Sequence, residues 1–331
     1  MHTYENIQAK NIFFITGRGR SGTWLLQSIL DTHPEICVTP EALFIIHLYG
    51  KYTNTKKWTA ERKAAFVRDL FTEEKLKNWW QSTPEAIHNL LEKYPPESRF
   101  SELCKAIYYE YAQRNDKENA HLLGDKNPEY SLYIRRLARL YRESKFVHLV
   151  RDPRANVLSY QNVDFDVDNV AALAHRWKKY NERVLDWQRE MPDRILVIHY
   201  EDLLTDTRVT LERICAFLGV DFIPSLLEFY RYSKNIFDWN KKITEPIDPK
   251  KATAWQGKIQ PKDEVCIFKI AGKVAADFGY TSDLKPKLTV KNRFGLFFGQ
   301  STFFLEKLLF KLPLKWRSAI LRVYRHRTKV L

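Results

Sequence analysis

Short apolar runs alternate with longer segments of helical periodicity along most of this chain. The runs typical of buried strands lie at residues 11–16, 121–124, 145–150 and 194–199. Helical spacing of apolar positions is found at residues 22–30, 130–141, 167–190, 206–218 and 264–278. Strands that alternate with helices indicate a parallel sheet covered by helices on both faces. The pattern therefore predicts an α/β fold with a central, mainly parallel sheet.

Two regions depart from this alternation. Residues 42–120 contain mostly helical patterns, at 59–80, 84–94 and 99–115, and are predicted to form a helical insertion. Residues 239–257 show no clear period and are predicted to be a loop. We expect a main domain at residues 1–286, which includes the insertion, and a separate C-terminal tail at 287–331.

The first predicted strand runs directly into a glycine-rich turn. Residues 17–24 have the sequence GRGRSGTW, and a helix is predicted to begin at Gly22. A turn of this kind before a helix binds anions, because backbone N–H groups and the helix dipole point at one spot. Gly17 and Gly22 have the spacing of a nucleotide-triphosphate loop, but Thr23 and Trp24 replace the lysine and the Mg²⁺-binding hydroxyl. The loop is therefore predicted to hold an anionic nucleotide without a metal.

A second basic loop follows another buried run. Arg151 and Arg154, in the segment Arg-Asp-Pro-Arg, come directly after the strand at residues 145–150. Ligands of parallel α/β sheets bind beyond the carboxyl ends of the strands. Two arginine-bearing loops at one sheet edge predict a nucleotide with phosphate groups at both ends.

Composition is that of an ordinary globular protein. Apolar residues make up 44% of the chain and charged residues 28%. No uninterrupted apolar run reaches the ~18 residues of a membrane-spanning helix, and the first residues lack a signal-peptide pattern. Four widely spaced cysteines are expected to be reduced core thiols. These features favour a cytoplasmic protein.

The positive charge is concentrated in the tail. Residues 287–331 hold eleven lysines and arginines against Glu306 alone, which gives the tail +10 of the formal charge of +14. The main body is therefore not expected to bind nucleic acid. Aromatic and aliphatic residues are interleaved with these cations, so residues 289–331 are expected to lie on an anionic membrane or to pack as a helical hairpin on the main domain. The first alternative predicts peripheral attachment to the inner face of the membrane.

Together, these motifs resemble those of the PAPS-dependent sulfotransferases (PAPS is 3′-phosphoadenosine 5′-phosphosulfate). The segment at 17–23, followed by Asp-Thr-His-Pro at 31–34, is similar to the family's 5′-phosphosulfate loop. The strand at 145–150, with Arg151 and Ser159 after it, is similar to the 3′-phosphate motif. His-Tyr-Glu-Asp-Leu at 199–203 and Phe-Leu-Gly at 217–219 are further landmarks. The branch most similar is the bacterial carbohydrate-type and tyrosylprotein-type one, and it implies a P-loop-like three-layer fold.

The resemblance implies PAPS as the co-substrate and assigns residues to it. The 5′-phosphosulfate would be held by Arg18, Arg20, Ser21, Gly22, Thr23 and Trp24, the 3′-phosphate by Arg151 and Ser159, and other parts of the nucleotide by Tyr200, Trp255 and Lys258. A sulfuryl group carries less negative charge than a phosphoryl group. Arginine and backbone donors can therefore stabilise its transfer without a metal ion, and none is expected.

Catalytic residues are implied in the same way. Glu41 stands where the tyrosylprotein branch has its catalytic base, and burial would have to raise its pKa. Alternatively, Glu41 pairs with Arg18 or Arg20. Lys126 resembles the lysine of the family's Asp-Lys-x-Pro element, which together with Arg20 would stabilise charge on the bridging oxygen. Otherwise, Lys126 is a lysine of a surface turn. Asp125 would orient Lys126.

Other residues limit the interpretation. His148 in a buried run and His33 at a helix end are expected to be structural. Ala254 and Trp239 replace a lysine and a serine of the tyrosylprotein branch, which favours a saccharide or glycolipid hydroxyl as the acceptor over a protein tyrosine.

Three alternatives remain open. The chain could be a protein-tyrosine sulfotransferase or a non-catalytic, nucleotide-binding and membrane-associated scaffold. A P-loop kinase or nucleotide triphosphatase is disfavoured by Thr23 and Trp24.

Overall fold

A five-stranded parallel sheet runs through the molecule. The computed structural model describes residues 4–163, 169–232 and 244–284, and the single positions 290, 294, 297 and 301. The strands are β1 (Asn11–Gly17), β2 (Ile36–Thr39), β3 (Leu122–Lys126), β4 (Lys145–Val150) and β5 (Ile195–His199). Their order is β2-β3-β1-β4-β5, and all four pairings are parallel. The predicted α/β class and parallel sheet are confirmed.

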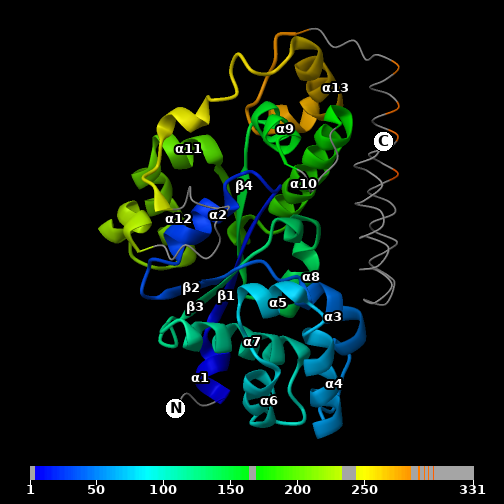
Figure 1. Cartoon of the computed structure of the whole chain (residues 1–331), viewed down its shortest axis with the longest axis vertical. Coiled ribbons are helices and arrows are strands. Elements are labelled where there is room, and N and C mark those ends of the chain that lie inside the picture. Colours follow the sequence, from blue (N-terminus) through cyan, green and yellow to red (C-terminus); the bar gives the residue numbers. More distant parts are fainter. Residues whose placement is uncertain are drawn as a thin grey trace.

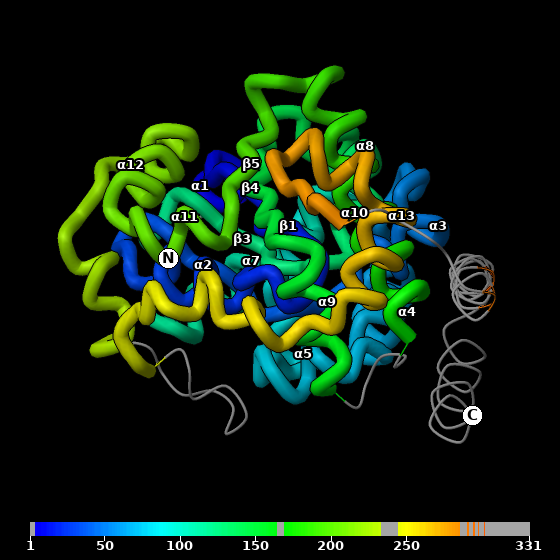
Figure 2. Tube along the Cα trace, turned by 90° about the horizontal axis from the view of Figure 1, so that it is seen from above, coloured from blue at the N-terminus to red at the C-terminus, as the bar shows by residue number. Residues whose placement is uncertain are grey.

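The central strand β1 is buried on both faces, which explains its continuous apolar sequence. Ile12 and Phe14 pack into the core on one face of the sheet, whereas Phe13 and Ile15 pack into the core on the other. Helices cover both faces and complete three layers, as predicted. In Figure 2 the strands lie between α11 and α12 on one side and α10 and α13 on the other.

The helices outside the insertion divide between these layers. Leu26 of α2 and Leu211 of α12 pack on the face of Phe13, and Val184 of α10 packs on the face of Phe14. The helices are α1 (Tyr4–Ala9), α2 (Thr23–Leu30), α8 (Ile134–Leu140), α9 (Pro153–Gln161), α10 (Val170–Glu190), α11 (Tyr200–Thr205), α12 (Thr207–Leu218) and α13 (Pro261–Asp277), with short 3-10 turns at η1 (Pro128–Leu132), η2 (Pro192–Arg194), η3 (Pro224–Arg231) and η5 (Pro249–Ala252).

The insertion is helical, as predicted, but is divided into more helices. These are α3 (Phe44–Tyr52), α4 (Ala60–Leu70), α5 (Glu74–Trp79), α6 (Pro84–Glu92) and α7 (Phe100–Arg114). The single helix predicted at 59–80 ends at Leu70, because the Thr72 hydroxyl donates to the Asp69 carbonyl at 2.6 Å and closes the last turn. In Figure 1, α4 and α6 lie at the end of the molecule opposite α13.

Several predicted boundaries moved, and one strand was missed. The strand predicted at 121–124 extends to Lys126, and the helix predicted at 130–141 is divided into η1 and α8 at Tyr133, whose φ of −125° is not helical. The edge strand β2 was not predicted, since four residues give too short an apolar run to distinguish. Among the described residues, no helix combines the length and the apolar character required to cross a membrane. The tail lies outside the described residues except for the four single positions.

Candidate functional site

The carboxyl ends of four neighbouring strands bring the predicted motifs to one edge of the sheet. Register pairs Ile15 of β1 with Lys126 of β3, and Gly17 of β1 with Leu149 of β4. On the other side of β3, Thr39 of β2 pairs with Asp125. The segments that follow these strands carry the glycine-rich loop, the Arg-Asp-Pro-Arg loop, Glu41 and Lys126, so they all emerge at the same edge.

The glycine-rich loop turns sharply into α2. Gly22 precedes the helix with φ +90°, and a Cβ placed there would lie 2.4 Å from the Tyr200 ring. Arg20 has φ +66°, a left-handed conformation uncommon for a residue with a side chain. The N-cap residue Gly22 has no side chain that could cap α2, so it leaves the N–H groups of the first turn to an anion.

Arg20, Arg151 and Ser159 join the two basic loops. The Arg20 Nε donates to the Ser159 Oγ at 3.1 Å, and the Arg151 Nη1 donates to the backbone carbonyl of Arg20 at 2.8 Å. The Arg151 guanidinium lies 4.5 Å from the centroid of the Tyr200 ring. The structure therefore brings together four of the residues assigned to the nucleotide.

Asn156 of α9 also holds the glycine-rich loop and was missed by sequence reasoning. Its side-chain nitrogen donates to the Gly19 carbonyl at 2.9 Å and to the Ser21 Oγ at 3.1 Å. The residue is buried. The signal that could have identified Asn156 was its position in the first turn of the helix after Arg-Asp-Pro-Arg. The first turn of a helix that starts at this edge of the sheet lies close to the glycine-rich loop.

Two of the arginines pack into the protein instead. The buried Arg18 guanidinium stacks on Tyr160, 4.0 Å from the ring centroid, and lies 5.1 Å from that of Tyr180. Arg154 donates to the carboxylates of Asp152 and Glu264 and so connects α9 to α13. Both placements support the framework of the site more directly than the binding of a ligand.

Trp255 and Lys258 lie apart from the loop contacts just described. The Arg154 guanidinium carbon lies 4.2 Å from the centroid of the Trp255 ring, on which it stacks. Lys258 is exposed, and its side chain makes no hydrogen bond or ion pair within the ranges that the structure describes. The assignment of these two residues to the nucleotide remains a prediction.

Glu41 is bound by two lysines. The Lys126 Nζ lies 2.7 Å from the Glu41 Oε1, and the Lys75 Nζ lies 2.8 Å from the Oε2. Lys126 is fully buried at the end of β3, so it is not a lysine of a surface turn. The ion pairs of Glu41 in the described residues are with these lysines rather than with Arg18 or Arg20. Lys75 comes from α5 of the insertion and was missed, since no motif surrounds it.

Two tryptophans stand beside these charges. The Lys126 Nζ lies 3.3 Å from the centroid of the Trp24 ring, and the Lys75 Nζ lies 4.7 Å from that of Trp79. The two indole rings are 5.9 Å apart. We call Glu41, Lys75, Lys126, Trp24 and Trp79 the Glu41 cluster.

Burial and ion pairing act in opposite directions on the pKa values of Glu41 and Lys126. Burial raises the pKa of Glu41, but Lys126 and Lys75 outweigh it and lower this pKa to about 2. The expectation of a raised pKa is therefore wrong for this state of the site. Burial lowers the pKa of Lys126 to about 8, against the attraction of Glu41.

Asp125 has a different role from the one suggested. Its carboxylate accepts hydrogen bonds from the hydroxyls of Tyr108 and Tyr130 and, at 2.7 Å, from the Asn127 side chain. Burial raises its pKa to about 7, against these hydrogen bonds. Through Tyr108 and Tyr130, Asp125 anchors β3 to α7 and η1. It does not orient Lys126, because the side chains of successive strand residues point to opposite faces of the sheet.

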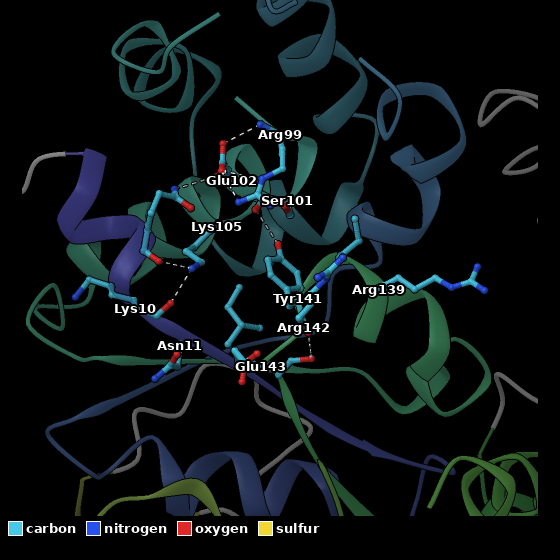
Figure 3. Close-up of a pocket in the computed structure, with 14 residues that line it drawn as sticks. Lys10, Asn11, Arg99, Ser101, Glu102, Lys105, Arg139, Tyr141, Arg142 and Glu143 are labelled. Atoms are coloured by element: carbon cyan, nitrogen blue, oxygen red, sulfur yellow. Dashed lines mark hydrogen bonds and ion pairs between the residues drawn. The ribbon is translucent and has the colours of Figure 1, made fainter. Parts of the chain in front are cut away.

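A cavity of about 330 Å³ lies at the opposite edge of the sheet (Figure 3). It opens between Asn11, at the start of β1, and Ser144, just before β4. Its Lys105 donates to the carbonyls of Gln8 and Lys10 at 2.6 and 2.8 Å. None of the residues predicted for the site lines this cavity, which separates it from the carboxyl edge.

The family is decided by a match to a family model. The model described as "Sulfotransferase family" matches residues 13–224 of this chain, a span that begins in β1 and includes both basic loops and the Glu41 cluster. The chain belongs to the sulfotransferase family. The expectation of a PAPS-dependent sulfotransferase enzyme is confirmed.

Curated relatives of this sulfotransferase carry names with different acceptors. Protein-tyrosine sulfotransferase 1 of Danio rerio is 21% identical over 288 residues, which cover 83% of this chain and 74% of the relative. Omega-hydroxy-beta-dihydromenaquinone-9 sulfotransferase Stf3 of Mycobacterium bovis is 23% identical over 267 residues, which cover 68% of each chain. The acceptor class therefore does not follow from family membership.

Solved structures support the same fold. The sulfotransferase domain of the Synechococcus PCC 7002 olefin synthase is 27% identical, with a TM-score of 0.59 over 85% of this chain and 97% of that domain. The sulfotransferase domain from the curacin biosynthetic pathway is 20% identical, with a TM-score of 0.57 over 82% and 98%. The P-loop-like three-layer fold is confirmed.

The histidines of this sulfotransferase occupy the structural places expected of them. His148 is buried between the Thr16 hydroxyl at 3.0 Å and the Asn181 side chain at 2.9 Å. His33 contacts the Asp221 carbonyl at 3.0 Å. Within the described ranges, no group of three or more His, Cys, Asp or Glu side chains is arranged to hold a metal ion.

Proposed function

We propose that this sulfotransferase moves a sulfuryl group from PAPS to an acceptor hydroxyl, with Glu41 as the base and Lys126 beside the bridging oxygen. The observation that carries the proposal is the 2.7 Å contact of Lys126 with Glu41 at the sheet edge where both basic loops emerge. A base next to a cation is the arrangement that sulfuryl transfer requires, since a proton leaves the acceptor as negative charge develops on the bridging oxygen.

The loops fit a nucleotide with phosphate at both ends. The uncapped N-terminus of α2 and Arg20 would hold the 5′-phosphosulfate together with Ser21, Gly22, Thr23 and Trp24. Arg151 and Ser159 would hold the 3′-phosphate, and Tyr200 would contact the nucleotide. The Arg151 Nε is buried and has no hydrogen-bond acceptor among the described residues. An unpaired buried donor of this kind is costly unless a ligand accepts from it.

The acceptor is proposed to be a saccharide or glycolipid hydroxyl. Trp24 and Trp79 offer flat aromatic faces next to Glu41, on which a sugar ring could lie. A protein tyrosine is the second candidate, favoured by the names of several relatives. Against it, Ala254 replaces a lysine of that branch, and the Trp239 substitution lies outside the described residues.

The proposal is tested by a transfer screen with ³⁵S-labelled PAPS against panels of polysaccharides, glycolipids, quinols and tyrosine peptides. Label on a saccharide or glycolipid is expected, with release of 3′,5′-adenosine bisphosphate and no effect of EDTA. Label confined to tyrosine would establish the second candidate. Binding of the bisphosphate, with no transfer to any panel and no release of bisphosphate from PAPS, would indicate a scaffold.

The tail is proposed to attach the enzyme to an anionic membrane surface, on the inner face if the protein is cytoplasmic. The charge of residues 287–331 supports this proposal. Removal of residues 289–331 is expected to abolish sedimentation with anionic liposomes. Equal sedimentation without the tail would reject it.

A further inference from the structure

Lys75 holds one side of the Glu41 carboxylate. It contacts the Oε2 at 2.8 Å, while Lys126 contacts the Oε1 at 2.7 Å. Each carboxylate oxygen therefore already has an ammonium partner. An acceptor hydroxyl that is to lose its proton to Glu41 must approach an oxygen that already accepts from one of these two lysines, and whose affinity for a proton that lysine lowers.

The two lysines differ in how firmly they are held. Lys126 is the last residue of β3 and its side chain is 0% exposed, whereas the Lys75 side chain is 38% exposed. Lys75 lies on the six-residue helix α5, which belongs to the insertion rather than to the sheet. Of the two contacts, the one made by Lys75 can be broken without disturbing the sheet.

The surroundings keep Lys75 positively charged. Burial lowers its pKa, but Glu41, Glu129 and Glu73 together raise it above the usual value. Lys126, which faces Glu41 from β3, is the other cation of the site, and Asp125 acts on Lys126 only at longer range. A cationic Lys75 lowers the proton affinity of Glu41, because an opposite charge at this distance favours the ionised carboxylate.

We propose that Lys75 is a positioning residue that keeps Glu41 ion-paired and inactive until an acceptor enters, and that its withdrawal frees the Oε2 to take the acceptor's proton. The inference rests on the proposed role of Glu41 as the base. Burial of Glu41 then acts in favour of catalysis, since a buried carboxylate that loses a cationic partner binds a proton more tightly.

Such an arrangement protects PAPS from water. If Glu41 were free without an acceptor, it could take a proton from a water molecule whose oxygen attacks the sulfur atom. The sulfur–oxygen bond to the 5′-phosphate would break, and the bridging oxygen would stay with the phosphate. The products would be sulfate and 3′,5′-adenosine bisphosphate. Lys75 suppresses this wasteful reaction as long as it holds the Oε2.

The test is hydrolysis of ³⁵S-labelled PAPS in the absence of any acceptor, measured as labelled sulfate released by the full-length chain. The variants are Lys75→Met, Glu41→Gln and the double variant. Lys77→Met is the matched control, because Lys77 is an exposed lysine on the same helix. Binding of 3′,5′-adenosine bisphosphate shows that each variant is folded, and Lys75→Gln replaces Lys75→Met if the latter loses binding.

Lys75→Met is expected to raise hydrolysis severalfold, up to roughly tenfold for each unit by which the pKa of the base rises. The acidic limb of the rate–pH profile of Lys75→Met should shift to higher pH, because its base has a higher pKa. Lys77→Met should hydrolyse PAPS at the wild-type rate. Lys75→Arg, which keeps the positive charge, should hydrolyse PAPS as slowly as the wild type. The double variant should fall to the level of Glu41→Gln. An unchanged Lys75→Met, with slower hydrolysis in Glu41→Gln, would overturn the inference but leave the base in place. Hydrolysis that is equal in Glu41→Gln and wild type would overturn the base assignment and the inference with it.

Discussion

In the two basic loops, proposed as the nucleotide side of the site, Arg20 and Arg151 donate to a hydroxyl and to a backbone carbonyl. In the Glu41 cluster, proposed as the acceptor side, Lys75 and Lys126 both bind the carboxylate of Glu41. Among the described residues, the two arginines have no carboxylate partner, and the Arg151 Nε lacks any acceptor. The nucleotide side therefore carries positive charge that is not neutralised. In the Glu41 cluster, by contrast, both carboxylate oxygens of Glu41 already have an ammonium partner.

This difference in ion pairing predicts how the two sides respond to their ligands. An anion can bind to the loops without breaking an ion pair, so the nucleotide side is prepared in advance. In the Glu41 cluster, two ammonium groups lower the affinity of the carboxylate for a proton, so proton transfer is favoured when one of these contacts is broken. Binding and chemistry should therefore be separable by mutation.

The largest expected effect is that of Lys126→Ala on the chemical step. Loss of the ammonium beside the bridging oxygen should lower kcat by roughly 10²- to 10³-fold, the usual cost of removing one group that stabilises developing charge. Affinity for 3′,5′-adenosine bisphosphate should fall much less than kcat, because the bridging oxygen is only one of the 5′-phosphate oxygens and its negative charge increases in the transition state. Single-turnover transfer measures the rate of the chemical step, and calorimetry measures the affinity for the bisphosphate. An equal loss in both would contradict the separation of binding from chemistry.

Arg151→Ala should affect nucleotide binding more than the chemical step, the reverse of Lys126→Ala. Removal of a charge-assisted contact to the 3′-phosphate should weaken bisphosphate binding by about 1.5–3 kcal/mol. EDTA should have no effect on either protein. Glu41→Gln is the matched control from the acceptor side and should bind the bisphosphate as the wild type does. Unaltered binding by Arg151→Ala would remove the 3′-phosphate assignment.

Gly22→Ala tests the shape of the glycine-rich loop. Its φ of +90° strains any side chain, and its Cβ would lie 2.4 Å from the Tyr200 ring. Gly219→Ala is the control for strain alone, since Gly219 has φ +87° but open space around its Cβ position. Thermal unfolding should show a loss about 1–2 kcal/mol larger for Gly22→Ala. Equal losses would show that the Tyr200 contact is unimportant.

Asp125→Asn tests the raised pKa of this buried carboxyl through the pH dependence of stability. The folded state raises the pKa of Asp125 to about 7, from 3.8. Between about pH 4 and 7 the folded state therefore retains a proton that the unfolded state has lost, so this residue's contribution to stability falls as pH rises. The variant minus wild-type difference in unfolding free energy should rise with pH, by at most about 1.4 kcal/mol per pH unit. A flat difference would contradict the raised pKa.

Sequence reasoning found the parts of the site that follow long buried strands. The runs that became β1 and β4 are continuously apolar, so the glycine-rich loop and Arg151 could be placed at one sheet edge. The strand β2 was too short to detect, although the family resemblance assigned catalytic roles to both Glu41 and Lys126.

Contacts between distant segments could not be predicted. Lys75 lies 34 residues from Glu41 in a helix that carries no motif, and the helix break that precedes it depends on a local hydrogen bond of Thr72. The pKa of Glu41 was misjudged for the same reason. Its burial was expected, but the sequence did not reveal that two lysines would bind both of its oxygens.

The most direct test of the account is ³⁵S transfer by Glu41→Gln, using the acceptor found in the screen, with bisphosphate affinity measured on the same preparation. The account predicts that Glu41→Gln binds the nucleotide like the wild type but transfers sulfuryl groups at least about 100-fold more slowly. Turnover by Glu41→Gln at the wild-type rate would contradict the assignment of the Glu41 cluster as the catalytic centre.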